Sequence, residues 1–274
     1  MIIAIDIGSQ ALFIAHINKN GQITHQAGFD TPPLAQDCLD LIKATIASDF
    51  SHQAFEAIVV GISGSVIDNI IQWGSNLGDD WINFDFKTAL ENEFQKPTLI
   101  ENDANLGGLA EAHQFAQIPQ SLVYLNIGAG IGSSVIADGK LVPALLNSEA
   151  GMTMLEYDGV TRKWEDFASG RAIYLAYNQL AKDIKSPDIW DAIADRISRG
   201  LLTLIPVIQP NVVVIGGVMG NYFTKYSEHL IALIDEKLPP ELNRPRVIAA
   251  KNPDSSVING CYYLYKYYAS QTNN

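Results

Sequence analysis

The chain is poor in cysteine and in positive charge, and each shortage excludes a class of protein. Its 274 residues include only two cysteines, Cys38 and Cys261, too few for a disulfide framework or for a metal site that needs three thiolates. We therefore expect a reducing, cytoplasmic location. The formal net charge is -12 at pH 7, and no cluster of Lys or Arg offsets it. We expect neither nucleic acid nor an anionic membrane as a partner.

Long apolar runs are also missing. No segment reaches the roughly 18 consecutive apolar residues expected of a membrane span. The start, MIIAIDIG, has no basic region and runs directly into a glycine turn, which predicts a β-strand and not a signal peptide. What is abundant is dispersed hydrophobic content, at 47% of all residues. This is enough to bury a large core, in one large domain or two of moderate size.

One strand pattern occurs twice in the chain. Residues 1–22 and 122–140 each contain an apolar strand that ends near Asp6 or Asn126, a glycine turn, a second apolar strand and an Asx-Gly turn. Such a pattern predicts a β-hairpin. A second pair of segments, 57–68 and 211–221, each run from an all-apolar strand into a Gly-rich turn. Strands without polar alternation are buried on both faces, as in a sheet covered by helices.

Helical patterns fill the space between these strands. We expect amphipathic helices at Leu34–Phe50, Phe86–Phe94, Asn105–Ala116, Gly170–Ile184, Asp188–Ile208 and Tyr222–Lys237. A further helix is expected at residues 255–270, packed back on the first half. The sequence therefore predicts an α/β protein of two duplicated domains, each a mixed sheet covered by helices, with a cleft between them. The expected limits are 1–104, joined by 255–270, and 105–254.

Two glycine turns have the composition of phosphate-binding loops. They read DIGSQ at Asp6–Gln10 and NIGAGIG at Asn126–Gly132. Glycine exposes backbone N–H groups and lets phosphate approach, because no Cβ blocks it. Asp6 can hold Mg²⁺ through water or phosphate, since a hard cation prefers oxygen ligands. Either turn alone is equally compatible with a simple hairpin turn, and their repetition favours the functional interpretation.

The motif ENDAN, Glu101–Asn105, follows an apolar strand and precedes a helical pattern. It therefore lies at the carboxyl end of a strand, where open α/β sheets bind ligands. Asp103 at this place can accept a proton from a sugar hydroxyl that attacks the γ-phosphate of ATP, and Asn102 can hold the hydroxyl by hydrogen bonding. The alternative is that these side chains only cap the next helix.

Three motifs together resemble the ROK family of repressors and sugar kinases. They are ENDAN, the GAGIG of Gly128–Gly132 and the EDFASGRAI of Glu165–Ile173; each alone is weak. The resemblance covers nearly the whole chain, from Asp6 to the turn at Gly216 and Gly217. It implies an actin-like, RNase H-like fold of two lobes, ATP and Mg²⁺ as cofactors, and phosphorylation of a hexose held between the lobes. A homodimer is common in the family.

The resemblance also implies roles for individual residues. Asp103 corresponds to the general base. The implied sugar ligands are Asn76, Asn102, Asp103, Glu149 and Glu165. The implied nucleotide-binding residues are Asp6, Gly8, Ser9, Gln10, Gly128, Ala129, Gly130, Gly132, Gly216 and Gly217. For Glu149 and Glu165 the alternative is an exposed loop or cap carboxylate, and for the last two glycines it is close packing of a helix.

Several positions depart from the family pattern. The family's zinc site uses a His followed by three Cys; Met152 takes the place of that His, and residues 155–163 contain no Cys. We expect no zinc. Gln10 and Ala129 stand where the family usually has Thr near the phosphates, and each loses a possible hydroxyl donor. Ser63 and Gly64 replace the usual Pro-Gly step.

The sequence favours an ATP-dependent kinase of a hexose or N-acylhexosamine, of the glucose or N-acetylmannosamine type. One alternative is a catalytically weak or inactive sugar sensor derived from a kinase, which Gln10, Ala129 and Met152 favour. Another is a DNA-binding repressor, which is disfavoured because the first strand begins at Met1 and leaves no room for a helix-turn-helix.

Overall fold

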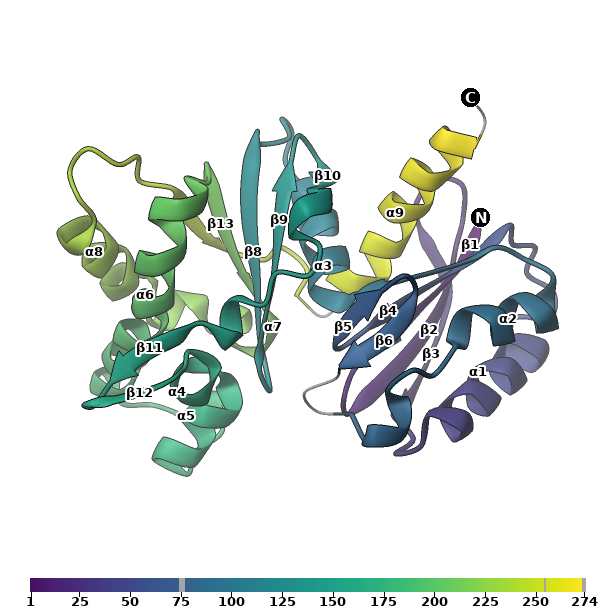
Figure 1. The fold of residues 1–274 in the computed structure, drawn as a ribbon, viewed down its shortest axis with the longest axis horizontal. Helices are drawn as coiled ribbons and strands as arrows, with labels where there is room; N and C mark the ends of the chain where they lie inside the picture. The colour runs from purple at the N-terminus through teal and green to yellow at the C-terminus, as the bar shows by residue number, and fades with distance from the viewer. Residues whose placement is uncertain (74–76, 254, 273–274) are drawn as a thin grey trace. The chain divides into compact units, whose positions relative to one another are not determined.

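The computed structural model describes residues 1–73, 77–253 and 255–272. The chain folds as two compact units, Met1–Ala110 with Ser255–Asn274 and Glu111–Asp254. In Figure 1 the first unit is purple to blue with the yellow C-terminal helix, and the second is teal to green. The sequence predicts a boundary at residues 104 and 105; in the structure it falls later, inside helix α3 (Asp103–Ala112).

The first unit is built on a five-stranded sheet in the order β3-β2-β1-β4-β7. Its strands are β1 (Ile2–Ile7), β2 (Ala11–Ile17), β3 (Ile23–Asp30), β4 (Ala57–Ile62) and β7 (Thr98–Asn102). Strand β1 pairs antiparallel with β2 and parallel with β4, so the sheet is mixed. The unit also contains β5 (Ser65–Ile67), β6 (Ile70–Trp73), α1 (Ala35–Asp49), a 3₁₀ helix (Asp79–Trp81), α2 (Phe86–Phe94) and α9 (Ser256–Thr272).

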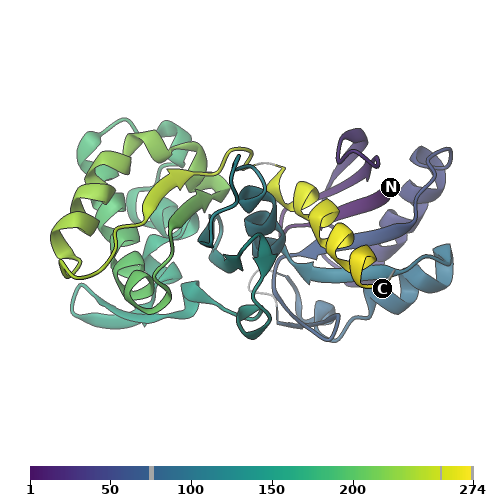
Figure 2. The same cartoon turned by 90° about the horizontal axis from the view of Figure 1, so that it is seen from above.

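Helices cover both faces of this sheet. Alternate residues of a strand point to opposite faces, and in β1 they divide between two hydrophobic clusters. Ile3 and Ile5 pack with α1 and α2, whereas Ile2 and Ala4 pack with α3 and α9. Figures 1 and 2 show α9 running across the face opposite α1. The burial on both faces that the sequence predicts for the apolar strands in 57–68 and 211–221 is confirmed in β4 (Ala57–Ile62) and β13 (Val212–Gly216), which are buried at every position.

The second unit repeats the design with the strand order β10-β9-β8-β13-β14. Its strands are β8 (Ser121–Ile127), β9 (Ile131–Ala137), β10 (Lys140–Leu141), β11 (Met154–Tyr157), β12 (Val160–Lys163), β13 (Val212–Gly216) and β14 (Arg246–Ala249). Its α-helices are α4 (Glu165–Ala168), α5 (Gly170–Tyr177), α6 (Pro187–Ile208), α7 (Gly217–Asn221) and α8 (Ser227–Lys237). Short 3₁₀ helices lie at Pro143–Leu145, Ala150–Met152, Ala181–Asp183 and Phe223–Lys225.

Strand register supports a duplication. Asp6 of β1 lies beside Gly61 of β4, and Asn126 of β8 lies beside Gly216 of β13. Both predicted hairpins, β1–β2 and β8–β9, form as antiparallel pairs. The two units differ after the strand that is fourth in the order of each sheet. In the first unit β4 continues into the hairpin β5–β6, whereas in the second β13 continues into helix α7. The fold is the predicted α/β type with mixed sheets covered by helices.

Three of the predicted helices are clearly shorter than expected. The helix predicted at Asn105–Ala116 is α3, which begins two residues earlier and ends at Ala112. The helix predicted at residues 170–184 ends at Tyr177, because Asn178 takes a left-handed conformation with φ 50° and caps it; Asn tolerates this conformation better than most residues. The helix predicted at residues 222–237 begins only at Ser227, after a 3₁₀ turn. No helix in the described part of the chain is long and apolar enough to cross a membrane.

Helix α9 docks through a glycine. A Cβ on Gly260 would lie 2.0 Å from the carbonyl oxygen of Leu106 in α3, a distance far inside van der Waals contact. Gly260 therefore lets two helix backbones approach closely, and this contact fixes the C-terminal helix on the first unit.

Replacement of Gly260 by Ala is expected to destabilise the protein. Overpacking costs about 1–3 kcal/mol, although Ala at an unconstrained helix position would stabilise by about 1 kcal/mol relative to Gly. Urea denaturation followed by circular dichroism measures the change. Gln271→Ala, at an exposed position of the same helix, is the control and should shift stability by less than about 0.5 kcal/mol. A Gly260→Ala protein as stable as wild type would contradict the close approach of α9 to α3.

Candidate active site

The parallel strands of the first unit bring polar side chains to one edge of the sheet. Strands β1, β4 and β7 run in the same direction, so their carboxyl ends meet there. Asp6 lies one residue before the end of β1, Asn102 ends β7, and Asp103 begins α3. Both carboxyl groups are partly buried, and the charge of Asp103 acts on Asp6. The structure therefore places the predicted base, Asp103, close enough to the predicted Mg²⁺ ligand, Asp6, for their charges to interact.

Asp103 has the protonation behaviour of a proton acceptor. Loss of hydration raises its pKa to about 6, although hydrogen bonds to the carboxylate oppose this shift. The donors include the backbone N–H of Ala104, which lies 2.8 Å from Oδ1, and the hydroxyl of Ser63. A carboxylate whose pKa lies close to neutral pH takes up a proton more readily than an ordinary aspartate.

The side chain of Ser63 is a partner of Asp103 that the sequence pattern does not indicate. Ile62 of β4 lies beside Asn102 of β7 in the parallel register, so Ser63 follows directly opposite Asp103. The backbone N–H of Ser63 donates to the carbonyl of Ile7 at 3.0 Å, which ties this turn to β1. The only sequence signal was the replacement of the usual Pro-Gly step by Ser63 and Gly64.

Asp6 carries the most strongly shifted pKa at this edge. Burial, and then the negative charge of Asp103, raise the pKa of Asp6 to about 8. Two carboxylates held together favour a bound cation, because a positive charge lowers the cost of ionising both. In residues 1–73, 77–253 and 255–272 no group of three or more His, Cys, Asp or Glu side chains is placed to hold a metal ion. A hard cation beside the two carboxylates Asp6 and Asp103 would take its other ligands from water and phosphate oxygens.

Asn102 acts as a helix cap. Its Oδ1 accepts from the backbone N–H of Asn105 at 3.0 Å, and its Nδ2 donates to the carbonyl of Gly64 at 2.8 Å. The capping alternative considered from the sequence is thus realised by this side chain. A side-chain amide has two hydrogens, and the bond to Gly64 uses one of them. Asn76, the other predicted sugar ligand from the first unit, lies outside the described residues.

In the first glycine turn one backbone N–H group already donates a hydrogen bond within the hairpin. The N–H of Gly8 donates to the carbonyl of Ala11 at 2.9 Å, and the N–H of Thr31 donates to the carbonyl of Gln10 at 3.0 Å. The hydroxyl of Thr31 also donates to the carbonyl of Gly8 at 2.7 Å. Ser9 is partly exposed and Gln10 is exposed. Phosphate binding by this turn would therefore depend on Ser9 and Gln10, not on the Gly8 N–H.

The second glycine turn is more open. A Cβ on Gly128 would meet no atom within 4 Å, so space remains for a ligand on that side. The carbonyl of Gly128 accepts from the N–H of Gly170 at 2.8 Å, which anchors the turn to the start of α5. Ala129 is exposed, and Gly130 and Gly132 are partly exposed.

Both predicted glutamates border this second turn. Glu165 accepts from the N–H of Ile131 through Oε2 at 3.3 Å. The hydroxyl of Ser133 accepts from the N–H of Ala150 at 3.0 Å and donates to the carbonyl of Ser148 at 3.1 Å, so it fixes the backbone on either side of Glu149. The structure therefore brings Glu149 and Glu165 to one part of the second unit, at the edge that carries the glycine turn.

The turn at Gly216 and Gly217 requires both glycines for packing. A Cβ on Gly216 would lie 2.2 Å from the hydroxyl of Tyr124, and one on Gly217 would lie 2.5 Å from Oδ1 of Asn126. Gly217 also has φ +65°, a conformation that most residues avoid. The packing alternative is therefore realised, and the turn lies directly beside Asn126 of the second glycine turn.

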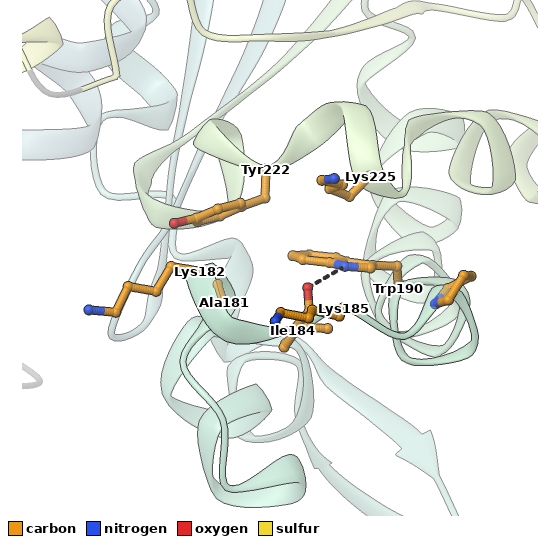
Figure 3. Close-up of a pocket in the computed structure, with 8 residues that line it drawn as sticks. Ala181, Lys182, Ile184, Lys185, Trp190, Tyr222 and Lys225 are labelled. Atoms are coloured by element: carbon orange, nitrogen blue, oxygen red, sulfur yellow. Dashed lines mark hydrogen bonds between the residues drawn. The ribbon is translucent and has the colours of Figure 1, made fainter.

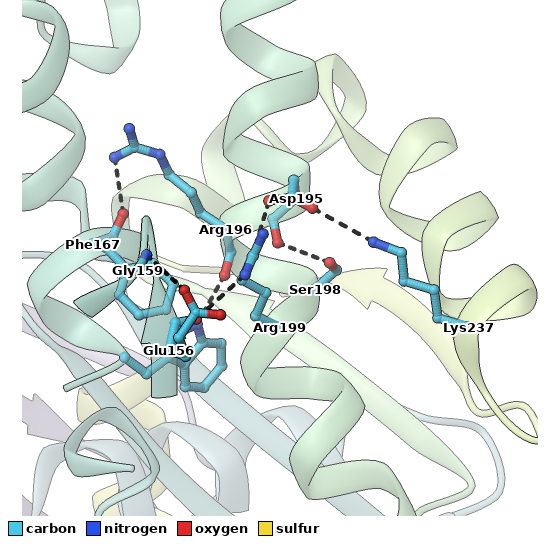
Figure 4. Close-up of polar contacts among 9 residues, drawn as sticks. Glu156, Gly159, Phe167, Asp195, Arg196, Ser198, Arg199 and Lys237 are labelled. Atoms are coloured by element: carbon cyan, nitrogen blue, oxygen red, sulfur yellow. Dashed lines mark hydrogen bonds and ion pairs between the residues drawn. The ribbon is translucent and has the colours of Figure 1, made fainter. Parts of the chain in front are cut away.

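A cluster of aromatic rings and arginines supports Glu165. Strands β11 and β12 form a hairpin in the segment where the sequence lacks the three Cys, and Tyr157 of this hairpin stacks on Phe167 at 4.5 Å. The guanidinium of Arg196 lies 5.2 Å from the centroid of the Tyr157 ring and donates to the carbonyl of Phe167 at 3.0 Å. Figure 4 shows Arg196 reaching Phe167 beside the Arg199–Asp195 ion pair. These contacts hold α4, which begins at Glu165.

Comparisons with known proteins identify the fold. A ROK family glucokinase from Streptomyces griseus, solved in complex with glucose and AMPPNP, matches with a TM-score of 0.82 at 22% sequence identity, over 96% of this chain and 98% of that one. An N-acetylmannosamine kinase from Salmonella newport is 31% identical over 147 residues, which are 51% of this chain and 48% of that protein. A xylose repressor from Caldicellulosiruptor bescii is 23% identical over 308 residues, covering 95% of this chain and 76% of that protein.

The family model also matches along nearly the whole chain. The ROK family model matches residues 2–267, nearly the whole chain, and the structural match shows the actin-like fold in the form of two related α/β units. The predicted resemblance is confirmed, and the chain belongs to the ROK family.

Proposed function

We propose that the protein is an ATP-dependent sugar kinase that transfers the γ-phosphoryl group of ATP to a hydroxyl of a hexose or N-acylhexosamine. The observation that carries this proposal is Asp103, a partly buried carboxylate at the carboxyl edge of a sheet with its pKa raised to about 6. Proteins similar to this chain include a glucokinase and an N-acetylmannosamine kinase, which supports sugar phosphorylation.

Asp103 supplies the general base in this mechanism. The sugar hydroxyl donates its proton to the carboxylate as its oxygen bonds to the γ-phosphorus, and the bond from that phosphorus to the β,γ-bridging oxygen breaks. Such transfers pass through a loose transition state, so most catalysis comes from positioning and charge stabilisation. The bonds from Ser63 and Ala104 to Asp103 hold the carboxylate in one orientation for this step.

Asp6 is the residue that would hold Mg²⁺. When bound, the cation neutralises charge on the phosphates and so makes the γ-phosphorus a better electrophile. The raised pKa of Asp6 means that the free protein keeps this carboxyl largely protonated near neutral pH. Ionisation of Asp6 is then coupled to cation binding, because a positive charge favours the carboxylate form.

The second unit would hold the donor and part of the sugar. The turn at Gly128–Gly132 has open space beside Gly128 and would offer phosphate the backbone N–H groups of Ala129 and Gly130, because the N–H of Gly128 donates to the carbonyl of Gly130 at 3.0 Å and that of Ile131 donates to Glu165. Gly216 and Gly217 would lie against adenosine. Glu149 and Glu165 would accept hydrogen bonds from sugar hydroxyls, and Asn102 would donate its second amide hydrogen to one. These roles rest on the family motif at each position.

A sugar sensor without turnover is the second candidate function. It is favoured by the Gly8 N–H, which already donates within its own turn, and by Gln10 and Ala129, which lack a hydroxyl. The similarity to a xylose repressor over 95% of the chain shows that the fold also occurs in regulators. The sensor binds sugar but releases no ADP.

A coupled assay of ADP release separates the two functions. The protein would be incubated with ATP, Mg²⁺ and a panel of hexoses and N-acylhexosamines, and the same sugars would be tested for a rise in melting temperature. Turnover with one sugar supports the kinase and names its substrate. A sugar that raises the melting temperature without ADP release supports the sensor.

Asp103→Asn should lower kcat by about 10²–10⁴-fold, because general base catalysis contributes a factor of this size. The affinity for sugar, measured by calorimetry, should stay within about threefold, since Asn keeps the shape and most hydrogen bonds of Asp. Asp138→Asn, in an exposed turn, is the matched control and should retain wild-type rates. An Asp103→Asn enzyme with more than about a tenth of the wild-type kcat would remove Asp103 from the base role.

The rate should fall in acid because the base must be ionised to accept a proton. At saturating Mg²⁺, which keeps Asp6 ionised, the pKa of about 6 at Asp103 leads us to expect that kcat/KM declines below pH 6 with a slope of one. Ser63→Ala removes a hydrogen bond that stabilises the carboxylate, so it should move this midpoint to higher pH. A profile that is flat from pH 5 to pH 7.5, or a Ser63→Ala midpoint that moves to lower pH, would argue against this assignment.

A further inference from the structure

The second unit contains a pocket that the proposed reaction already accounts for. It lies between residues 181–187 and residues 222–225 (Figure 3). Tyr222 caps helix α7, which begins at Gly217, so the pocket adjoins the turn assigned to adenosine and belongs to the proposed donor site. The first unit, in contrast, holds a partly buried carboxylate to which the mechanism gives no role, that of Glu101.

Glu101 lies in the same row of the sheet as Asp6. In the parallel register Asp6 of β1 lies beside Gly61 of β4, and Gly61 lies beside Glu101 of β7. Side chains at one level of a sheet point to the same face, which here is the face that α3 and α9 cover. A Cβ on Gly61 would lie 2.7 Å from Leu106 and 2.5 Å from Val257, so apolar side chains pack over this row. Loss of hydration accordingly raises the pKa of Glu101.

One oxygen of Glu101 holds the start of helix α3. Its Oε1 accepts from the backbone N–H of Asn102 at 2.8 Å and from the side-chain Nδ2 of Asn105 at 2.9 Å. Both bonds favour the carboxylate form and oppose the rise in its pKa. The Asn105 residue is only 1% exposed, and a buried amide requires a hydrogen-bond partner. Glu101 therefore ties the end of β7 to the first turn of α3.

The segment fixed in this way carries both groups that the proposed mechanism uses on the sugar. Strand β7 ends at Asn102 and helix α3 begins at Asp103, so the strand passes directly into the helix. The N–H of Asn105 also donates to Oδ1 of Asn102 at 3.0 Å, so Asn105 is held through both its backbone and its side chain. Rotation of the peptide between Glu101 and Asn102 would move the amide of Asn102 and the carboxylate of Asp103 together. A misplacement of about 1 Å can lower a rate by about 10²-fold.

The geometry points to Glu101 as a positioning residue that, together with Asn105, holds Asn102 and Asp103 in the orientation in which they meet the sugar hydroxyl. This inference rests on the proposed function, because it concerns the acceptor side of the same site. Burial and hydrogen bonds are the causes of the pKa shift of Asp103, so Glu101 acts on that residue through geometry. An uncharged acceptor of the same length should therefore serve in its place.

A matched pair of variants tests this role. Glu101→Gln keeps the length and a carbonyl oxygen that can accept both bonds, whereas Glu101→Met keeps the length without an oxygen. We expect kcat/KM for the sugar to fall at least about tenfold in Glu101→Met and to stay within about threefold of wild type in Glu101→Gln. The affinity for AMPPNP, measured by calorimetry, should change less than about twofold in both, since the second unit holds the donor. Glu241→Ala, at an exposed position, is the control and should match wild type.

A merely structural role would give another result. It would lower the melting temperature but leave kcat and the sugar KM of the folded protein unchanged, so the assays are run well below the melting temperature of each variant. Wild-type kinetics in Glu101→Met, or a Glu101→Gln protein as impaired as Glu101→Met, would overturn the positioning role. Glu101→Ala repeats the comparison should Glu101→Met not fold.

Calorimetry with sugar and without ATP distinguishes failure of this inference from failure of the proposed function. If the wild type binds a sugar but releases no ADP, the kinase fails, and the positioning role still predicts a sugar affinity at least about tenfold weaker in Glu101→Met and restored in Glu101→Gln. If the wild type and Glu101→Met phosphorylate the sugar equally well, only the positioning role fails. A wild-type protein that binds no sugar would overturn both.

Discussion

Burial of the central strands on both faces is the constraint on which the rest of the structure depends. Strands β4 and β13 are buried at every position, and β1 at all but one. Backbone groups in such strands are satisfied by pairing, so polar side chains have no place along them. Function must then lie where the strands end. Asp6, the one partly exposed residue of β1, and Asn102 at the end of β7 follow from this rule.

Duplication supplied two such edges, and they have diverged. Both sheets keep one strand order, but Asp6 and Asn126 occupy matching registers beside Gly61 and Gly216. The first edge carries two carboxylates, and the charge of Asp103 raises the cost of ionising Asp6, which suits proton transfer and cation binding. The second carries an uncharged amide and an open glycine turn, which suits phosphate. The charged Asp6 and the uncharged Asn126, at matching strand positions, thus give the first unit an edge suited to protons and cations and the second unit an edge suited to phosphate.

The segment without the family's zinc ligands shows how packing can take over a positioning task. Stacking of Tyr157 on Phe167, with Arg196 against the Tyr157 ring, fixes a hairpin beside α4. Such contacts contribute about 0.5–2 kcal/mol each, and several of them acting together restrict the helix that begins at Glu165. Trp164, directly before it, is buried and donates to the carbonyl of Arg196 at 3.1 Å. These contacts, together with the N–H of Ile131, which donates to Oε2 at 3.3 Å, orient the carboxylate of Glu165.

The sequence by itself determined the local features of this protein: apolar strands, the glycine turns after them, most helices and the α/β class, because these depend on periodicity and on backbone sterics within a few residues. It also indicated Asp6, Asp103 and both glutamates through motifs. Only the tertiary structure decided that Ser63 bonds to Asp103 and that α9 packs on α3 through Gly260. Hydration, charge and close contact at these places arise from residues distant in sequence, so no local pattern encodes them.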